Sequence, residues 1–487
     1  MTNPVEAVRY LWESASLPSQ ALSRLVLSED PDPSVNSSFK LGSAALASQS
    51  AIALSGLSTV AVDARHAVLE FRSEAWYIVN GRLPSGSLFD DLAGLYKTKD
   101  NSYVRLHTNF PHHRQGILDI LRCEPTKEAV ANALLQWNAV GFETEASSRK
   151  MVATAVRSFA EWDEHPQGRA LANTLPVQLI KVADAPRRKI AGARGHPLDG
   201  IRVLELTRVL AGPVCGRTLA GHGADVLWIT SPSLPALPLL DIETSRGKRT
   251  TQLDLASLED RQTLAGLVKE ADVFLQAYRP GGLHDKGFGV DNVMTGHRGV
   301  VYASLNAYGW EGPWKDRRGF DSLVQTATGF NLGEAEAHAS YAGEDPAHVI
   351  PRAFPMQALD HAAGYLLAFG INAALCKTIT EGGSWEVRVS LAAVGQWIRY
   401  LGRLDPMVAF GVGRPFPPHT LPQDPEIAVL ATAVTQLASD KPAIEHHDMT
   451  AIRHAAILSK TPVMEGQAPM GLNVHEPGCL GLEEDPG

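Results

Sequence analysis

The alternation of strand and helix patterns across residues 198–310 constrains the fold more than any other feature of this sequence. Apolar, β-rich runs recur there, and helical patterns such as 257–270 fill the gaps between them. The runs are 201–207, 224–230, 271–277 and 299–305. Strands that alternate with helices form βαβ units with a parallel sheet and helices on its faces. The sequence therefore predicts an α/β fold whose large domain has a Rossmann-like parallel sheet.

The turn Leu210-Ala211-Gly212-Pro213 follows the first of these strands and begins a helix. Proline is tolerated near the first position of a helix, where its missing N–H costs nothing. The free N–H groups of such a helix start suit an anionic ligand. The turn lacks the GxGxxG pattern, so a dinucleotide is not favoured.

Composition places the chain among ordinary globular proteins with more than one domain. It has 487 residues, of which 44% are hydrophobic and 20% charged. A formal charge of −9 argues against nucleic acid or a membrane surface as a partner. The N-terminus has no signal-peptide pattern, and no apolar run is expected to be long enough to span a membrane. These features favour a cytoplasmic enzyme.

The cysteines are scattered along the chain and form no CxxC pair, so we expect reduced thiols: Cys123, Cys215, Cys376 and Cys479. Cys215 could be a reactive thiol at a helix start, but its small neighbours favour a packing role. The run His107 to His113 lacks an acid or cysteine that would complete a metal site, and it more plausibly fixes a turn. We therefore predict no metal.

Residues 358–402 repeat the helix–strand–helix order of residues 44–77, in which the strand is expected near 59–68. The similarity could be chance, or it could reflect a truncated tandem duplication or a circular permutation. The segments that we expect are 1–183 (this repeat plus a small α+β domain), 184–197 (a linker), 198–403 (the Rossmann-like catalytic domain) and 404–487 (a wrapping segment).

Two basic elements follow strands of the predicted sheet. The run 246–249 (RGKR) could wrap phosphate or could be a solvated turn. Tyr278 and Arg279 begin a Pro-Gly turn where a parallel sheet places its ligand crevice. There Tyr278 could stack on an adenine and Arg279 could meet a phosphate, or the turn could bind nothing.

Asp321 stands between a strand end and a helix start, where a carboxylate can be held in a cleft. Most often such an aspartate caps its helix. As a nucleophile it could attack a thioester carbonyl, and as a base it could remove a proton next to one if burial raised its pKa.

These segments, taken in order, resemble the class III CoA-transferase family, which includes formyl-CoA and carnitine CoA-transferases and the α-methylacyl-CoA racemases. The matching segments are LDGIRVLELTRVLAGPVCGRTLAGHGADVLWIT, RGKRTTQLDL, ADVFLQAYRPGGLHDKGFG, VVYASLNAYGWEGP and GFDSLVQTATG. Residues 88–175 resemble the smaller domain of the family, which normally follows the large one. The resemblance therefore implies a rearranged domain order and, from the interlocked dimers of the family, a homodimer.

The resemblance also implies roles for individual residues. Asp321 matches the catalytic aspartate, and Val209, Leu210 and Ala211 would line the CoA and acyl site. Residues along the CoA nucleotide would be Lys248, Arg249, Tyr278, Arg279, Pro280 and Lys286, with Tyr308 and Gly309 near the thioester. Thr230-Ser231 departs from the acid that the family usually carries there.

The implied activity is CoA transfer from an acyl-CoA to a carboxylic acid, through an aspartyl anhydride and an aspartyl-CoA thioester. CoA would then be a substrate and no cofactor would be tightly bound. A 2-methylacyl-CoA racemase is the alternative, but neither His284 nor His297 clearly fits its second base. A non-catalytic CoA-binding protein is the other alternative, because the domain order is rearranged.

Overall fold

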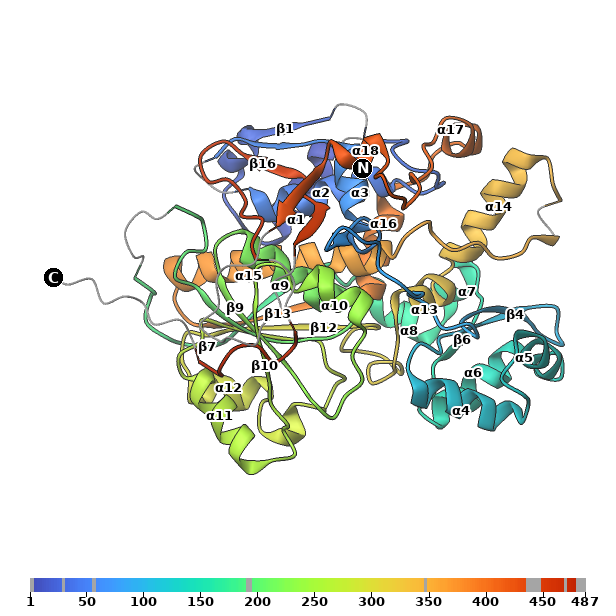
Figure 1. Ribbon diagram of the computed structural model, residues 1–487, viewed down its shortest axis with the longest axis horizontal. Coiled ribbons are helices and arrows are strands. Elements are labelled where there is room, and N and C mark those ends of the chain that lie inside the picture. Colours follow the sequence, from blue (N-terminus) through green and yellow to red (C-terminus); the bar gives the residue numbers. More distant parts are fainter. Residues whose placement is uncertain are drawn as a thin grey trace.

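A seven-stranded sheet lies at the centre of the protein (Figure 1). The structure is a computed structural model, and it describes residues 4–28, 31–54, 58–189, 195–345, 348–434, 448–467 and 471–478. Its strand order is β10-β9-β8-β11-β12-β13-β7. The strands are β7 (Gln178–Ala183), β8 (Arg202–Leu206), β9 (Asp225–Thr230), β10 (Arg249–Gln252), β11 (Val273–Gln276), β12 (Val301–Asn306) and β13 (Ser384–Ser390). All neighbours pair in parallel except β7, which runs antiparallel to β13. The predicted α/β fold with a parallel sheet is confirmed.

Helices cover both faces of this sheet because its strands carry apolar side chains on both sides. Val203 and Leu275 pack toward α9 (Ala211–Gly221) and α15 (Ala358–Thr380). Their neighbours Leu204 and Phe274 pack with α11 (Leu258–Val268) and α12 (Val290–Gly296) on the other face. Figure 1 shows α9 and α15 on one side of the sheet and α11 and α12 on the other.

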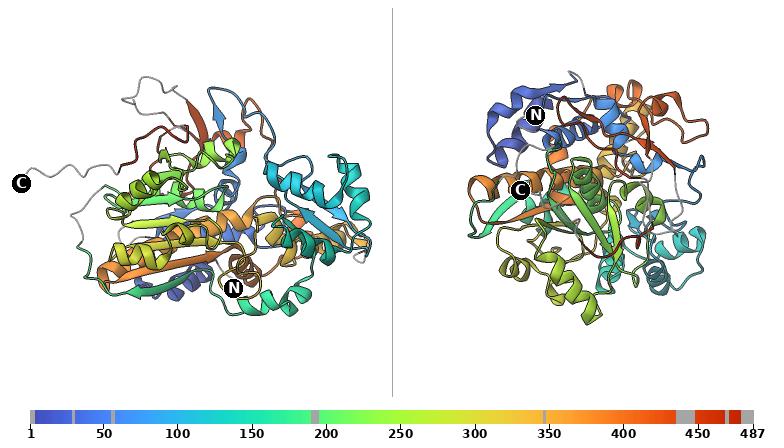
Figure 2. Two further views of the ribbon diagram at one scale, coloured as in Figure 1. Left: turned by 90° about the horizontal axis from the view of Figure 1, so that it is seen from below. Right: turned by 60° about the vertical axis from the view of Figure 1, so that its left-hand side comes forward.

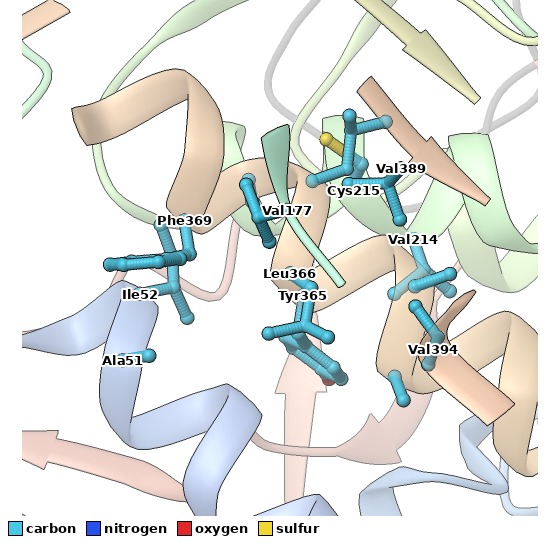
Figure 3. Packing of buried hydrophobic residues seen from close by; sticks show 14 of the residues in the cluster. Ala51, Ile52, Val177, Val214, Cys215, Tyr365, Leu366, Phe369, Val389 and Val394 are labelled. Carbon is cyan, nitrogen blue, oxygen red and sulfur yellow. The ribbon is translucent and has the colours of Figure 1, made fainter. Parts of the chain in front are cut away.

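Helix α15 is the central element of the core. It packs against α9 and against α2 (Leu41–Ala53), and Tyr365, Leu366 and Phe369 lie among side chains of both (Figure 3). By length and composition this helix could cross a membrane, so the expectation that no apolar run is long enough was wrong. Within the protein, 78% of its most apolar window is buried, which is typical of a core helix.

The first and last segments of the chain form one layer over α15 (Figure 1). The N-terminal segment contains α1 (Pro4–Ser14), β1 (Leu25–Leu27), β2 (Val60–Val62), α3 (Ala64–Glu70) and β3 (Ile78–Val79). The C-terminal segment contributes β14 (Ala431–Val434), β15 (Met449–Ile452) and β16 (Ala456–Leu458). These pair in two small sheets, β1-β2-β16 and β14-β15-β3. The described part of the 404–487 segment thus completes the sheets of the N-terminal unit, and its wrapping role stays a prediction.

The predicted repeat occurs as α2-β2-α3 and as α15-β13-α16 (Leu391–Leu401). The first strand is shorter than the expected 59–68, because Asp63 accepts the N–H of His66 and so caps α3. Strand β7, which we assigned to the 1–183 unit, joins the large sheet instead. Duplication or permutation remains a prediction.

A smaller unit lies at one end of the molecule, as Figure 1 and the left view of Figure 2 show. Its sheet contains β4 (Gly94–Lys97), β5 (Tyr103–Leu106) and β6 (Ala153–Ala155), and its own apolar core packs against α4 (Pro111–Leu121), α5 (Lys127–Leu134) and α6 (Ala139–Ser148). Helix α13 (Asp321–Ala327) contacts β5 and β6, so this unit adjoins the end of the large domain that carries Asp321. The remaining helices are α7 (Phe159–Glu164), α8 (Pro166–Leu171), α10 (Pro238–Thr244), α14 (Phe330–Ala342), α17 (Pro406–Gly411) and α18 (Pro425–Ala428).

Candidate active site

A cavity of about 710 Å³ lies where the parallel strands of the large sheet end. Residues that follow β8, β9, β10, β11 and β12 line it, including Val209, Ser231, Leu255, Tyr278 and Ala307. Parallel sheets bind ligands beyond the carboxyl ends of their strands, near the point where the strand order reverses, which here lies between β8 and β11. The volume is within the range of small-molecule sites.

The loop after β8 brings backbone groups to this cavity. Val209, Leu210 and Ala211 all line it, and their role at a CoA and acyl site stays a prediction. Val209 has φ of +74°, a left-handed conformation that is unusual for a β-branched residue. Such strain persists only where surrounding structure enforces it, and it is concentrated at functional sites. The strained turn leads directly into α9, whose first N–H groups have no partner within the helix.

Basic side chains make one side of the cavity electropositive. Arg208, Arg279, Lys286, Arg317 and Arg318 line it. Burial, and then the nearby charge of Arg279, lowers the pKa of Arg318 to about 10. Burial and then Arg208 lower the pKa of Arg279 as well. Cations that repel one another in a partly buried site favour an anionic ligand.

The small unit supplies a wall of the cavity that the sequence did not indicate. Phe110, His112 and His113, at the start of α4, line it. Burial, and then His112 and Arg318, lower the pKa of His113 to about 3, so neutral His113 accepts a hydrogen bond from Arg318 at 3.1 Å. His107 stacks on Phe320 with ring centroids 3.9 Å apart. The histidine run thus forms the turn after β5, as expected, and also supports the residue that precedes Asp321.

Asp321 is the first residue of α13 and is 1% exposed. Its Oδ2 accepts the N–H groups of Leu359 at 2.8 Å and Asp360 at 2.9 Å, and Gln325 donates to its Oδ1. The carboxylate therefore caps the first turn of α15 and not its own helix. Burial outweighs these hydrogen bonds and raises the pKa of Asp321 to about 6. Asp321 does not itself line the cavity, whereas its neighbours Gly319 and Phe320 do.

Asp360 is the second carboxylate at this point, and the sequence analysis missed it. It lies in the first turn of α15, is 9% exposed and lines the cavity. Burial raises its pKa well above the ordinary value, and Asp321 and Glu74 add to the effect. The sequence could have indicated this residue only as an acid in the first turn of an otherwise apolar helix. Such an acid usually stabilises its helix by interacting with the positive end of the helix dipole.

The structure places two predicted CoA contacts away from the cavity. The Lys248 side chain is fully buried, and its Nζ lies 2.8 Å from Glu205. Arg249 forms an ion pair with Asp225 at 2.8 Å. Both side chains are thus held by acids on neighbouring strands of the sheet, β8 and β9, because β10 runs beside β9.

Tyr308 and Gly309 also lie outside the lining of the cavity. Tyr308 is 1% exposed and packs edge-on against Trp314. Gly309 exchanges two hydrogen bonds with Asn306, at 2.7 and 3.0 Å, which closes the turn after β12. By contrast Tyr278, Arg279, Pro280 and Lys286 do line the cavity, and so do Thr230 and Ser231, where the sequence departs from the family pattern.

Cys215 is buried, and burial raises the pKa of its thiol well above the ordinary value, which fits a packing residue. Cys123, Cys215 and Cys376 are free thiols, and Cys479 lies outside the described residues. Among the residues that the structure describes, no group of three or more histidine, cysteine or acidic side chains could hold a metal ion.

Comparison with known proteins shows similarity over the large domain. Residues 198–404 match CoA-transferase family III. The acetyl-coenzyme A transferase nodX of Hypoxylon pulicicidum is 29% identical over 338 residues, which cover 64% of this chain and 55% of the relative. A probable fatty acyl-CoA transferase of Mycobacterium tuberculosis is 33% identical over 214 residues, covering 41% of this chain and 52% of the relative.

A crystal structure of a CAIB/BAIF family protein from Brucella suis superposes with a TM-score of 0.36 and 26% identity, over 43% of this chain and 58% of that one. This chain therefore spans about half the length of the curated relatives that it matches.

Proposed function

Because residues 198–404 belong to CoA-transferase family III, we propose that this protein is an enzyme that transfers CoA from an acyl-CoA to a carboxylic acid. The observation that carries the proposal is the electropositive cavity of about 710 Å³, whose wall at Gly319 and Phe320 leads directly to Asp321. Relatives named succinate–glutarate CoA-transferase and cinnamoyl-CoA:phenyllactate CoA-transferase support an acyl-CoA donor and a carboxylate acceptor.

CoA enters this site as a substrate and not as a tightly bound cofactor. Val209, Leu210 and Ala211 offer backbone groups at the start of α9 to the pantetheine arm and the acyl group. Tyr278, Arg279, Pro280 and Lys286 line the cavity, and in this proposal the first three meet the nucleotide and Lys286 meets a phosphate. Arginine is suited to phosphate because its planar donors match the phosphate oxygens.

Asp321 is the nucleophile in this proposal. Its carboxylate attacks the thioester carbonyl carbon, CoA departs with the sulfur electron pair, and an acyl-aspartyl anhydride forms. CoA then attacks the aspartyl carbonyl, and the donor acid leaves. The acceptor carboxylate takes CoA through the reverse sequence. Because Phe320 and Asp360 line the cavity and Asp321 does not, the side chains of the wall must move for the acyl group to reach the carboxylate.

The test removes the nucleophile and keeps the fold. Asp321→Asn retains an oxygen that accepts the N–H groups of Leu359 and Asp360, and we expect it to abolish exchange. Asp321→Ala should also abolish exchange, and it should unfold more easily by about 1–3 kcal/mol because it leaves these groups unpaired. Donors are acetyl-CoA, succinyl-CoA and cinnamoyl-CoA, with acetate, succinate, glutarate and phenyllactate as acceptors.

Ser322→Ala is the matched control. The Ser322 hydroxyl is buried and has no hydrogen-bond partner, so its loss should leave exchange unchanged. Turnover retained in Asp321→Asn, with Ser322→Ala also active, would exclude Asp321 as the nucleophile.

A CoA-binding protein without transferase activity is the second candidate. It is favoured by the hydrogen bonds to both Asp321 oxygens and by the absence of this residue from the cavity lining. Calorimetric titration that shows tight CoA binding, with no exchange for any pair of the panel, would support it.

For the racemase alternative, neither of the histidines weighed as a second base, His284 and His297, lines the cavity. Proton exchange next to the thioester of a 2-methylacyl-CoA in deuterated water, without an acceptor acid, would restore that alternative.

A further inference from the structure

Asp360, unlike Asp321, presents a carboxyl group that a ligand in the cavity would contact. Its side chain lines the cavity and is 9% exposed, whereas Asp321 is 1% exposed and lies behind the wall. The N–H of Asp360 donates to Asp321 Oδ2 at 2.9 Å, so the main chain of α15 fixes the two acids side by side. No hydrogen bond or ion pair among the described residues holds the Asp360 carboxyl itself, which leaves it available to a ligand.

The charged groups that face Asp360 come from three elements. Asp321 faces it from α13, and Glu74 faces it from the short helix Ser73–Ala75. His361, the next residue of α15, is turned to Glu74, with Nε2 to Oε2 at 2.9 Å. Burial and the two neighbouring carboxylates, Asp321 and Glu74, disfavour a negative charge on Asp360. Asp360 therefore keeps its proton, while Asp321, whose carboxylate accepts more hydrogen bonds, is ionised.

We propose that Asp360 is a second catalytic residue, an acid and base that moves one proton to and from the CoA sulfur. This inference rests on the proposed CoA-transferase function. When Asp321 attacks the thioester, the carbon–sulfur bond breaks and its electron pair stays on sulfur, which takes the proton of Asp360. The products of the step are an acyl-aspartyl anhydride, neutral CoA thiol and ionised Asp360.

The second half of the exchange restores the proton. Ionised Asp360 removes the proton of the CoA thiol as the sulfur attacks the aspartyl carbonyl carbon, and the donor acid leaves as a carboxylate. Asp360 is then protonated again, Asp321 carries CoA as a thioester, and no oxidant, reductant or further reactant is needed. The proton transfer avoids releasing a thiolate into a buried site beside carboxylates, where a negative charge is poorly solvated.

Asp360→Asn tests this role because the amide keeps the size of the side chain and can donate a hydrogen bond, but cannot give up a proton. We expect kcat for the panel above to fall about 10²-fold or more, the range of general acid catalysis. The dissociation constant of CoA, measured by calorimetry, should change less than about threefold. Asp291→Asn, which alters an exposed acid in the first turn of α12, is the control for loss of a helix N-terminal charge.

The pH profile separates proton transfer from a structural role. Asp321 must be ionised to attack, so the wild-type rate should fall as pH drops below about 6. Asp360 must be protonated to assist, so the wild-type rate should fall again as pH rises through its higher pKa. Asp360→Asn should keep the acidic limb, lose the alkaline limb and lose the solvent deuterium isotope effect on kcat.

The outcomes are distinct. An active wild type whose kcat, alkaline limb and isotope effect all depend on Asp360 supports the proposal. An active wild type with an unchanged profile in Asp360→Asn overturns this inference alone, and a wild type inactive on every pair overturns it together with the proposed function. Asp360→Ser repeats the test if the first variant does not fold.

Discussion

Lys248 lies beneath the first turn of α9 with no contact to solvent. Its Nζ donates to Glu205 and, at 2.9 Å, to the carbonyl oxygen of Pro213, and it stands 4.6 Å from the centre of the Trp228 ring. Burial lowers the pKa of Lys248 and raises that of Glu205, and their mutual attraction opposes both shifts without cancelling them. The ion pair therefore stabilises the first turn of α9, which directly follows the loop after β8 that lines the cavity. Arg279 and Lys286 are instead the basic groups that line the cavity itself.

Lys248→Met should destabilise the protein by about 3–5 kcal/mol, because it leaves Glu205 buried without its cation. Adding Glu205→Gln to that variant should recover much of the loss, as apolar or neutral replacements of buried ion pairs often do. Urea unfolding of both single variants and of the double variant measures the coupling between the two side chains. Additive losses, with no recovery in the double variant, would contradict the pairing.

Individual residues show how far the sequence could lead. Tyr278 and Arg279 were predictable as residues near a ligand crevice, since parallel sheets bring the carboxyl ends of their strands to one edge, whereas Val209 was implied only by the family resemblance. Lys248 was wrongly assigned to the CoA nucleotide because the sequence of a basic run does not show whether its side chains face solvent, a ligand or a buried acid. His113 and Asp360 were missed as lining residues because they reach the cavity from elements far away in sequence, and only the packing of α4 and α15 brings them there.

At the scale of elements, the close packing of α15 against α9 positions the loop after β8, which leads into α9 and lines the cavity. A Cβ on Gly364 would lie 2.7 Å from the carbonyl oxygen of Ala211 and 2.8 Å from Val214 Cγ1. The two helices can therefore come this close only because residue 364 has no side chain. Ala211 lines the cavity, so the spacing of these helices sets the shape of the ligand site.

Gly364→Ala should push the start of α9 away from α15. We expect a loss of about 1–3 kcal/mol in unfolding free energy, typical of overpacking, together with weaker CoA binding by calorimetry. Gly266→Ala is the matched control, because a Cβ there meets nothing within 4 Å and removal of a helical glycine adds about 0.5–1 kcal/mol. Unchanged CoA affinity in Gly364→Ala would show that helix spacing does not set the site.

Strands β8, β9, β11 and β12 of the large sheet could be predicted at this scale because each is a short apolar run between helices, whereas β10 is polar and β7 was assigned to the 1–183 unit. The small strands β14, β15 and β16 could not, since three- and four-residue strands carry too little pattern to stand out. Strand β15 pairs with β3 and strand β16 with β2, both hundreds of residues away, and only tertiary pairing reveals these partners.

At the scale of the whole molecule, the N-terminal strands β2 and β3 pair with strands β16 and β15 in the layer over the central helix α15. The N-terminal unit and the C-terminal strands share two sheets, so part of the architecture is completed within one chain. We propose that the protein nevertheless forms a homodimer, as the family resemblance implies. Light scattering during size-exclusion chromatography should give twice the chain mass of 52.4 kDa, and a single-chain mass would contradict this proposal.

The central claim is a covalent bond to Asp321 during turnover. Active enzyme mixed with acyl-CoA is quenched with hydroxylamine or borohydride, digested, and analysed by peptide mass spectrometry. We predict a hydroxamate or a reduced side chain at Asp321, and none at Asp360, in the peptides that carry these two residues. An unmodified Asp321 peptide from demonstrably active enzyme would contradict the account.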